Sequence, residues 1–275
     1  MTTLPPPSPR KLGLVIDLDT CVGCHACAVA CKEWNDGGQF GPLPDRDAYG
    51  AEPDGVWFNR VHSYAVEPGS GIRDSHSGKA EGASNRCTGP DPQSPIPNPG
   101  LTVHFPRSCL HCETPGCVTV CPTGASYKRA EDGIVLVDED KCIGCQLCAW
   151  ACPYGAREIS IRKGTMQKCT LCVDRIYNET LDEEDRQPAC VKACPTRARH
   201  FGDLGDAESA VSRLVAERDG YALMPEFGYR PVNRYLPPRP RRDAANAPPA
   251  PPREETLDRE KLPGVLRWLD RVLSR

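Results

Sequence analysis

The sequence predicts an α+β fold in which two similar cysteine-rich modules form a pseudo-twofold repeat, with a long loop insertion and an amphipathic C-terminal helix. Three observations support this fold class. Cysteine supplies 17 of the 275 residues, which is several times its usual share. A short apolar strand followed by a run of cysteines occurs twice, at 12–31 and at 133–152. Gly, Pro and Ser dominate 67–100, and this composition is typical of an exposed loop.

Composition limits the classes of protein that fit. Aromatic residues make up only 6% of the chain and the mean hydropathy is −0.49, so we expect a modest apolar core. We expect the cysteines to supply the stability that this core lacks. No apolar run approaches the roughly 18–20 residues of a membrane helix, and no secretory signal is recognisable. The net charge of −3 without a long basic block argues against a nucleic-acid partner. Cysteines in a reducing compartment are more often metal ligands than disulfides.

Sixteen of the cysteines fall into four groups of four. Group one is Cys21, Cys24, Cys27 and Cys31; group two is Cys109, Cys112, Cys117 and Cys121; group three is Cys142, Cys145, Cys148 and Cys152; group four is Cys169, Cys172, Cys190 and Cys194. Groups one and three have the spacing C-x2-C-x2-C-x3-C, which binds iron–sulfur clusters in bacterial ferredoxins. Group two lengthens one gap to four residues, and group four separates its halves by 17 residues.

This spacing has a geometric reason. A [4Fe–4S] cube presents four irons at its corners, and a tight run of cysteines reaches three of them. The fourth thiolate comes from elsewhere in the chain, which is why the fourth cysteine of such a run, often followed by proline, serves the other cluster of a pair. Proline follows Cys121, Cys152 and Cys194, whereas Lys32 follows Cys31. Structural zinc is the alternative, but zinc sites use two pairs of ligands rather than unbroken four-cysteine runs.

The remaining elements follow from these runs. Residues 12–19 and 133–138 alternate toward strands that deliver groups one and three, and 131–133 predict a hairpin turn before the second strand. Each strand with its cluster loop is a ferredoxin-like unit. Beyond these units we predict an insertion at 36–100 that is flexible at 67–100, an extended tail with a proline-rich linker at 206–252, and an amphipathic helix at 253–275.

The predicted C-terminal helix has apolar residues at the i, i+3, i+4, i+7 spacing of an amphipathic helix. They are Leu262, Val265, Leu266, Leu269, Val272 and Leu273. We expect this helix to dock on the protein itself or on a partner subunit, and the alternative is a membrane surface. Cys87 lies outside the four groups and is predicted to be a surface thiol, with redox sensitivity or a partner contact as alternatives.

Histidines and basic residues lie beside the cysteines. His25 and His111 sit inside predicted cluster loops, and because cysteines fill all four ligand positions we expect them to form hydrogen bonds or face solvent. Six basic residues flank the groups, where they either offset the negative charge and tune reduction potentials or form ordinary surface charge. These six are Arg107, Lys168, Arg175, Lys192, Arg197 and Arg199.

The order of the four groups, with MQKCTLCVDR at 166–175 and CPTRARHFGDL at 194–204, resembles the electron-transfer (beta) subunit of molybdopterin oxidoreductases related to dimethyl sulfoxide reductase. The resemblance covers roughly residues 12–205. It implies four [4Fe–4S] clusters that pair group one with group four and group two with group three. The implied ferredoxin-like modules are therefore 11–35 with 160–205 (groups one and four) and 101–159 (groups two and three). The implied ligand sets are Cys21, Cys24, Cys27 and Cys194; Cys169, Cys172, Cys190 and Cys31; Cys109, Cys112, Cys117 and Cys152; and Cys142, Cys145, Cys148 and Cys121.

Details of the resemblance narrow the branch of the family. Cys145 stands where nitrate reductase subunits have tryptophan, which argues against that branch. CVGCHACAVACKEWN at 21–35 and VWFNRVHSY at 56–64 are similar to the iron–sulfur subunit of the membrane-bound sulfite-oxidising enzyme. Subunits for reduction of dimethyl sulfoxide, thiosulfate, polysulfide or tetrathionate are the alternatives within the family.

The resemblance implies a non-catalytic subunit that relays electrons between a molybdopterin-containing catalytic subunit and a membrane anchor subunit with a quinone site. The chain carries no motif of an active site of its own. A free-standing polyferredoxin is the alternative, but the proline-rich linker and amphipathic C-terminus favour a docked subunit. We expect a peripheral position on the cytoplasmic face of the inner membrane, or on the periplasmic face if a partner carries the folded chain across.

Overall fold

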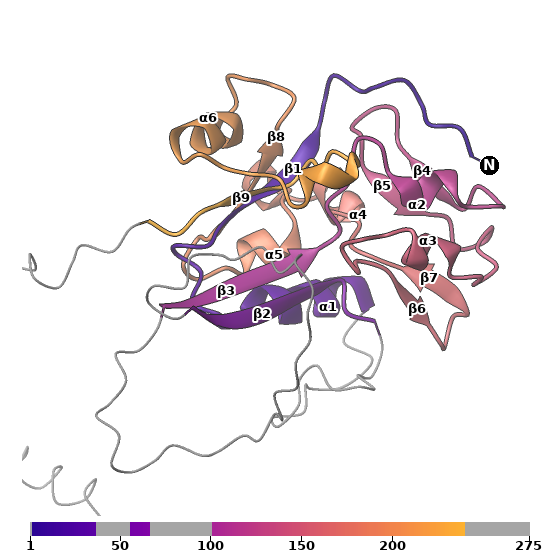
Figure 1. The fold of residues 1–275 in the computed structure, drawn as a ribbon, viewed down its shortest axis with the longest axis horizontal. Helices are drawn as coiled ribbons and strands as arrows, with labels where there is room; N and C mark the ends of the chain where they lie inside the picture. The colour runs from indigo at the N-terminus through magenta and orange to yellow at the C-terminus, as the bar shows by residue number, and fades with distance from the viewer. Residues whose placement is uncertain (1, 37–55, 67–100, 240–275) are drawn as a thin grey trace, which may run out of the picture. The chain divides into compact units, whose positions relative to one another are not determined.

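A three-stranded sheet supports the cysteine loops. The computed structural model describes residues 2–36, 56–66 and 101–239. Strand β1 (Leu12–Asp17) lies between β8 (Arg199–Asp203), which is antiparallel to it, and β9 (Arg234–Leu236), which is parallel to it (Figure 1). Segments far apart in sequence therefore meet in this sheet. Residues 1–238 form one unit and 239–275 a second.

Both faces of β1 are buried. Leu14 and Ile16 belong to the main apolar cluster, while Val15 belongs to a second cluster on the other face. Side chains alternate between the faces of a strand, so a strand buried on both faces requires the near-continuous apolar run LGLVID. The predicted strand at 12–19 is therefore present, and it ends at Asp17.

The segment after β8 differs from the prediction. We predicted an extended tail at 206–252, but helix α6 (Ala210–Glu217), the 3₁₀ helix η2 (Pro225–Phe227) and β9 occupy part of it. Ser209 begins α6 by accepting a hydrogen bond from the Ser212 N–H at 3.2 Å. The prediction was wrong for 206–236 because the helix has little more than two turns and β9 is stabilised by pairing with β1 rather than by local pattern.

The described residues also form three two-stranded antiparallel sheets, which lie below and to the right of the central sheet in Figure 1. They are β2 (Asn59–Val66) with β3 (Leu101–Ser108), β4 (Ser126–Lys128) with β5 (Val135–Val137), and β6 (Glu158–Ser160) with β7 (Thr165–Gln167). The predicted strand at 133–138 corresponds to β5, and the turn before it contains Gly133 at φ +72°. The β6–β7 hairpin crosses the boundary that we predicted between 159 and 160.

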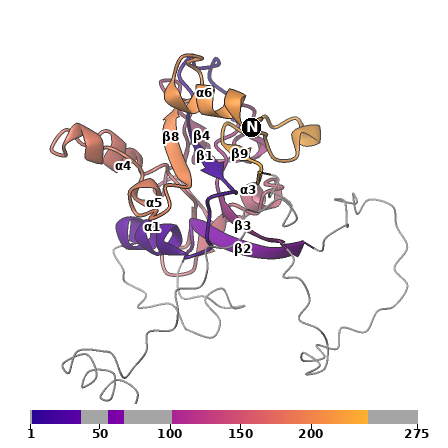
Figure 2. The same cartoon turned by 90° about the vertical axis from the view of Figure 1, so that its left-hand side faces the viewer.

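The helices are short, and several pack in pairs. Helices α1 and α5 lie side by side in both views (Figures 1 and 2), and α2 lies beside α3 (Figure 1). The bounds are α1 (Ala26–Asp36), α2 (Gly116–Thr119), α3 (Leu147–Trp150), α4 (Val173–Ile176), the 3₁₀ helix η1 (Glu183–Asp185) and α5 (Ala189–Lys192). Each pair joins two cysteine groups, because α1 carries part of group one, α2 of group two, α3 of group three and α5 of group four.

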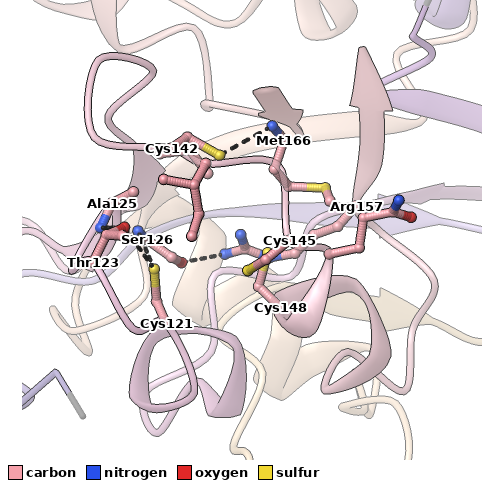
Figure 3. A pocket seen from close by; sticks show the side chains of 12 residues that line it. Cys121, Thr123, Ala125, Ser126, Cys142, Cys145, Cys148, Arg157 and Met166 are labelled. Carbon is pink, nitrogen blue, oxygen red and sulfur yellow. Dashed lines mark hydrogen bonds between the residues drawn. The ribbon is translucent and has the colours of Figure 1, made fainter. Parts of the chain in front are cut away.

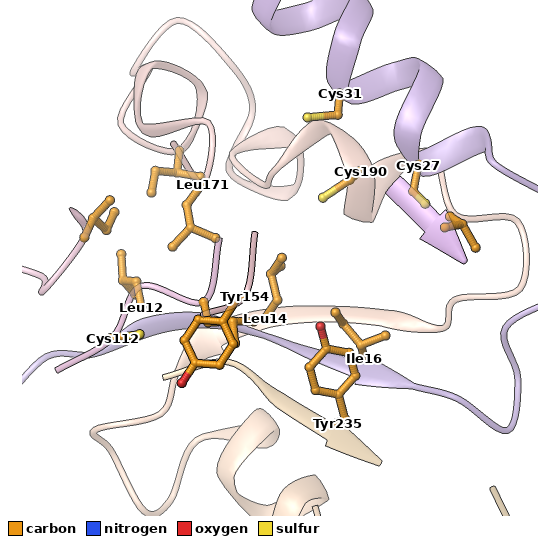
Figure 4. Close-up of a cluster of buried hydrophobic side chains, with 14 of the residues drawn as sticks. Leu12, Leu14, Ile16, Cys27, Cys31, Cys112, Tyr154, Leu171, Cys190 and Tyr235 are labelled. Atoms are coloured by element: carbon orange, nitrogen blue, oxygen red, sulfur yellow. The ribbon is translucent and has the colours of Figure 1, made fainter. Parts of the chain in front are cut away.

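Cysteines are members of the core itself. The main apolar cluster contains Leu14, Ile16, Leu171 and Tyr235, and four cysteines of the predicted sites are buried among them (Figure 4). Those four are Cys27, Cys31, Cys112 and Cys190. A cofactor bound by these side chains therefore adds directly to the packing of a core that is modest in apolar residues.

Several predicted features lie outside the described residues. They are the flexible stretch at 67–100, Cys87, the linker beyond 239 and the amphipathic helix at 253–275 with its leucines and valines. Within the three described ranges, no helix combines the length and the hydropathy needed to cross a bilayer.

Candidate iron–sulfur sites

All four cysteine groups use the same local geometry. The third cysteine of each group is the second residue of a helix, and the fourth follows four residues later. The third cysteines are Cys27, Cys117, Cys148 and Cys190. The local backbone therefore repeats even where the sequence gaps in groups two and four differ from the ferredoxin spacing.

The residue before the second cysteine has a positive φ in every group. It is Gly23 at +69°, His111 at +46°, Gly144 at +68° and Leu171 at +55°. Glycine adopts this conformation without penalty, whereas a side chain such as that of Leu171 is strained there. Strain of this kind is found at functional sites where the surrounding structure holds the backbone in place.

The helix pairs bring cysteines of different groups together. A pocket of about 330 Å³ is lined by Cys142, Cys145 and Cys148 of group three and by Cys121 of group two (Figure 3). A second pocket of about 320 Å³ is lined by the first three cysteines of group one and by Cys194 of group four. In each pocket the fourth cysteine comes from the partner group.

The other two sets are more buried. Burial raises the pKa of Cys31 well above its usual value, and Cys169, Cys190 and Cys172 of group four add to the shift. The Asn35 side chain lies against both parts of this set, with its Nδ2 3.5 Å from Cys31 Sγ and 3.8 Å from Cys172 Sγ. Groups one and four thus contribute cysteines to a second shared set.

The fourth set, in the module of groups two and three, likewise combines three cysteines of one group with the fourth cysteine of the partner group. Burial raises the pKa of Cys112, and the neighbouring Cys109, Cys117 and Cys152 raise it further. Three cysteines of group two therefore face the fourth cysteine of group three. The sixteen cysteines lie in four sets of four, and their role as iron ligands stays a prediction.

Backbone amides point at several sulfurs. The N–H groups of Ser126, Ala198 and Met166 donate to Cys121 Sγ at 3.4 Å, Cys194 Sγ at 3.2 Å and Cys142 Sγ at 3.3 Å. Such donors favour the thiolate over the thiol and orient it toward a metal. At Cys121, burial would raise the pKa, but the donors of Ser126 and Thr123 lower it below its usual value.

The donor chemistry fits [4Fe–4S] clusters. Burial and the negative charge of neighbouring thiolates raise the pKa of Cys169 to about 12, and they raise that of Cys172 to about 11. Thiolates at these buried positions are favourable only beside compensating positive charge, which iron supplies. Within the described ranges, no three His, Cys, Asp or Glu side chains converge as ligands of one metal ion; a cubane does not require this, because each of its thiolates binds a different iron.

Two buried arginines lie among the thiolates. Arg157 is 6% exposed and Arg199 is 3% exposed. Among the residues that the structure places, Nε and Nη1 of both guanidinium groups have no hydrogen-bond partner. Buried donors are normally satisfied, so these groups fit acceptors on bound clusters. Arg199 was among the predicted basic residues; Arg157 was missed, although both end the repeated pattern Cys-Pro-x-x-Ala-Arg at 152–157 and 194–199.

Of the other histidines and basic residues predicted beside the cysteines, some are buried and others are exposed. His111 is fully buried and its Nδ1 accepts the Val135 N–H at 3.1 Å, so the predicted hydrogen bond is present. Lys168 is also buried, and its Nζ donates to the carbonyls of Val135 and Cys169. Arg197 and Lys192 are exposed, and Lys192 forms a surface ion pair with Asp185 at 2.7 Å.

Comparison with known proteins identifies the family. A model of the 4Fe-4S dicluster domain matches residues 101–204, and a model of the 4Fe-4S binding domain matches residues 12–33. A sulfite dehydrogenase subunit from Allochromatium vinosum is 52% identical over 229 residues, which cover 83% of this chain and 84% of that protein. The chain belongs to the iron–sulfur subunits of the molybdopterin oxidoreductases.

Other members of this family share less of the sequence. A putative dimethyl sulfoxide reductase iron-sulfur subunit from Halobacterium salinarum is 35% identical, over 82% of this chain and 78% of that protein. A tetrathionate reductase subunit from Salmonella typhimurium is also 35% identical, over 83% of this chain and 74% of that protein. The resemblance based on the cysteine groups is confirmed, and so is the [4Fe–4S] type of the protein with its ferredoxin-like domains.

Proposed function

We propose that this protein is the electron-transfer subunit of a sulfite-oxidising molybdenum complex and that its cysteines hold four [4Fe–4S] clusters. The observation that carries the proposal is the arrangement of sixteen cysteines in four sets, each with three cysteines of one group and the fourth of its partner group. We assign the ligands as these sets. A bound [4Fe–4S] cluster takes up and releases one electron at a time.

The residues of the chain give the four sites different environments. Cys24 and Cys145 are exposed, whereas Cys31, Cys112 and Cys169 are buried. The two sets with an exposed cysteine therefore suit electron exchange with partners, and the buried sets suit transfer within the protein. Apolar side chains lie exposed beside Cys145, with Ile143 66% exposed and Trp150 85% exposed, and an exposed apolar patch is typical of a contact surface.

We propose two partners for these surfaces. One is a molybdopterin-containing catalytic subunit, which is the source of electrons, and the other is a membrane anchor subunit with a quinone site. The support is membership of the family and the 52% identity to a sulfite dehydrogenase subunit. We propose a peripheral position of the complex on the cytoplasmic face of the inner membrane, and the alternative is the periplasmic face after export with a partner.

Sulfite titration of the native complex tests the proposal. The chain is tagged, its complex is purified anaerobically, and sulfite is added while the visible absorption of the clusters is recorded. We expect bleaching with sulfite and none with sulfate as the control. Absence of bleaching, with dithionite-reduced clusters reoxidised by a sulfoxide, thiosulfate, polysulfide or tetrathionate, would instead assign the protein to a reductase, as the 35% identity to a tetrathionate reductase subunit would allow. Purification without any partner would favour a free-standing polyferredoxin.

Replacing Cys145 tests the cluster assigned to group three. We expect Cys145→Ala to lose this cluster or convert it to a three-iron form, because no other cysteine of group three is free to replace the missing thiolate. Iron content and the EPR spectrum of the anaerobic protein report the change. Cys87→Ala is the matched control, since Cys87 lies outside the four groups. Unchanged iron content and EPR spectrum in Cys145→Ala would refute the assignment.

A further inference from the structure

Arg157 touches both cysteine sets of its module. Its Nη2 donates to Cys117 Sγ at 3.0 Å and to Ser126 Oγ at 2.8 Å, and Cys117 belongs to the set with Cys109, Cys112 and Cys152. The same side chain lines the pocket that contains Cys121, Cys142, Cys145 and Cys148, where it lies among their side chains (Figure 3). One guanidinium group therefore lies between two proposed cluster sites.

Arg199 occupies the corresponding place in the other module. It lines the pocket of Cys21, Cys24, Cys27 and Cys194, and its charge also acts on Cys190 and Cys31 of the neighbouring set. Its Nη2 donates to Asn59 Oδ1 at 2.7 Å, so strand β2 fixes its orientation as Ser126 fixes that of Arg157. Both arginines thus have one anchored nitrogen and two buried nitrogens without a partner in the described part of the chain.

We infer that the guanidinium groups of Arg157 and Arg199 each lie between the two cluster sites of one module. There they raise the reduction potentials of both neighbouring clusters. The inference rests on the proposed cluster sites. Reduction adds negative charge to a cluster, and a nearby cation stabilises the added charge. Burial strengthens this effect because solvent screens the charge poorly there, and hydrogen bonds to sulfur act in the same direction.

The surroundings hold the two guanidinium groups charged. Burial alone would lower the pKa of Arg199, but negative charge on the sulfurs of Cys190 and Cys27 raises it above its usual value. Burial likewise opposes the charge of Arg157, and Cys117 and Cys109 raise its pKa. Arginine keeps its proton throughout the working pH range, so its influence on the potentials does not vary with pH.

Potentiometric EPR titration of the purified, cluster-loaded protein tests the inference. We expect Arg199→Gln to lower the potentials of the two clusters of groups one and four, and Arg157→Gln to lower those of groups two and three. The expected effect is about a tenfold fall in the equilibrium constant for one-electron reduction, or ~59 mV for each affected cluster. Arg→Lys variants keep the charge and should retain most of the wild-type potential.

Arg197→Gln is the matched control, because Arg197 is exposed and lies two residues from Arg199. Four unchanged potentials at full iron content would overturn the inference, as would an equal shift in the Arg197 control. Loss of clusters in both the Gln and the Lys variants would also overturn it and leave the arginines a purely structural role. The cluster content of the wild-type protein is measured before any variant is compared. Absence of clusters from the wild-type protein would refute the proposed function itself.

Discussion

Replacing Cys31 with alanine should abolish a different cluster from the one abolished by Cys27→Ala, although both residues lie on α1 and only four positions apart. Cys27 lines the pocket of Cys21, Cys24 and Cys194, whereas Cys31 faces Cys169, Cys172 and Cys190. The fourth cysteine of the run thus belongs to the neighbouring site. We expect each variant to lose one cluster and to keep the other three.

Iron content and potentiometric EPR spectra of the two anaerobic proteins measure the result. Cys190→Ala provides the decisive comparison: it should remove the same EPR component as Cys31→Ala, because both cysteines belong to one set. Loss of one common component in Cys27→Ala and Cys31→Ala would mean that group one serves a single cluster, and it would contradict the proposed exchange of ligands. These variants also assign two of the EPR components to their cysteine sets.

The cysteine spacing predicted the iron–sulfur type of the protein, and the order of the four groups with their flanking segments predicted the family. The spacing reflects local geometry, since a tight loop and one helical turn place each run of thiolates. Glycine at 23 and 144 is visible in the sequence as part of this geometry. The same backbone conformation at His111 and Leu171 was not predictable, because neither residue favours a positive φ and only the surrounding structure imposes it.

Long-range pairing accounts for the parts that the sequence did not predict. Strand β2 pairs with β3 along their whole length, but local pattern placed β2 inside an insertion. Strand β9 has three residues and lies in the central sheet only because β1 pairs with it. Arg157 carried a usable signal in its Cys-Pro-x-x-Ala-Arg repeat, but its position between two cysteine sets depends on the packing of α2 against α3.

Substitution of Asn233 should destabilise the protein strongly, even though this residue lies in the segment that we predicted to be an extended tail. Asn233 is fully buried. Its Oδ1 accepts the Leu14 N–H at 2.9 Å, and its Nδ2 donates to the Cys109 carbonyl at 3.1 Å. Asn233→Ala leaves both backbone groups buried and unpaired, at a cost of about 1–3 kcal/mol each. We therefore expect a loss of about 2–6 kcal/mol of stability.

Thermal unfolding of the cluster-loaded protein, followed anaerobically by circular dichroism at one scan rate, measures this loss. The expected fall in Tm is about 5–15 °C. Asn178→Ala is the control, because the Asn178 side chain bonds to Thr180 in an exposed turn and its loss should cost under about 1 kcal/mol. A Tm for Asn233→Ala equal to that of the control would show that residues after β8 are peripheral. A large fall in Tm would instead show that Asn233, next to β9, holds group two against β1. The cysteine loops would then depend on a segment that contains no cysteine.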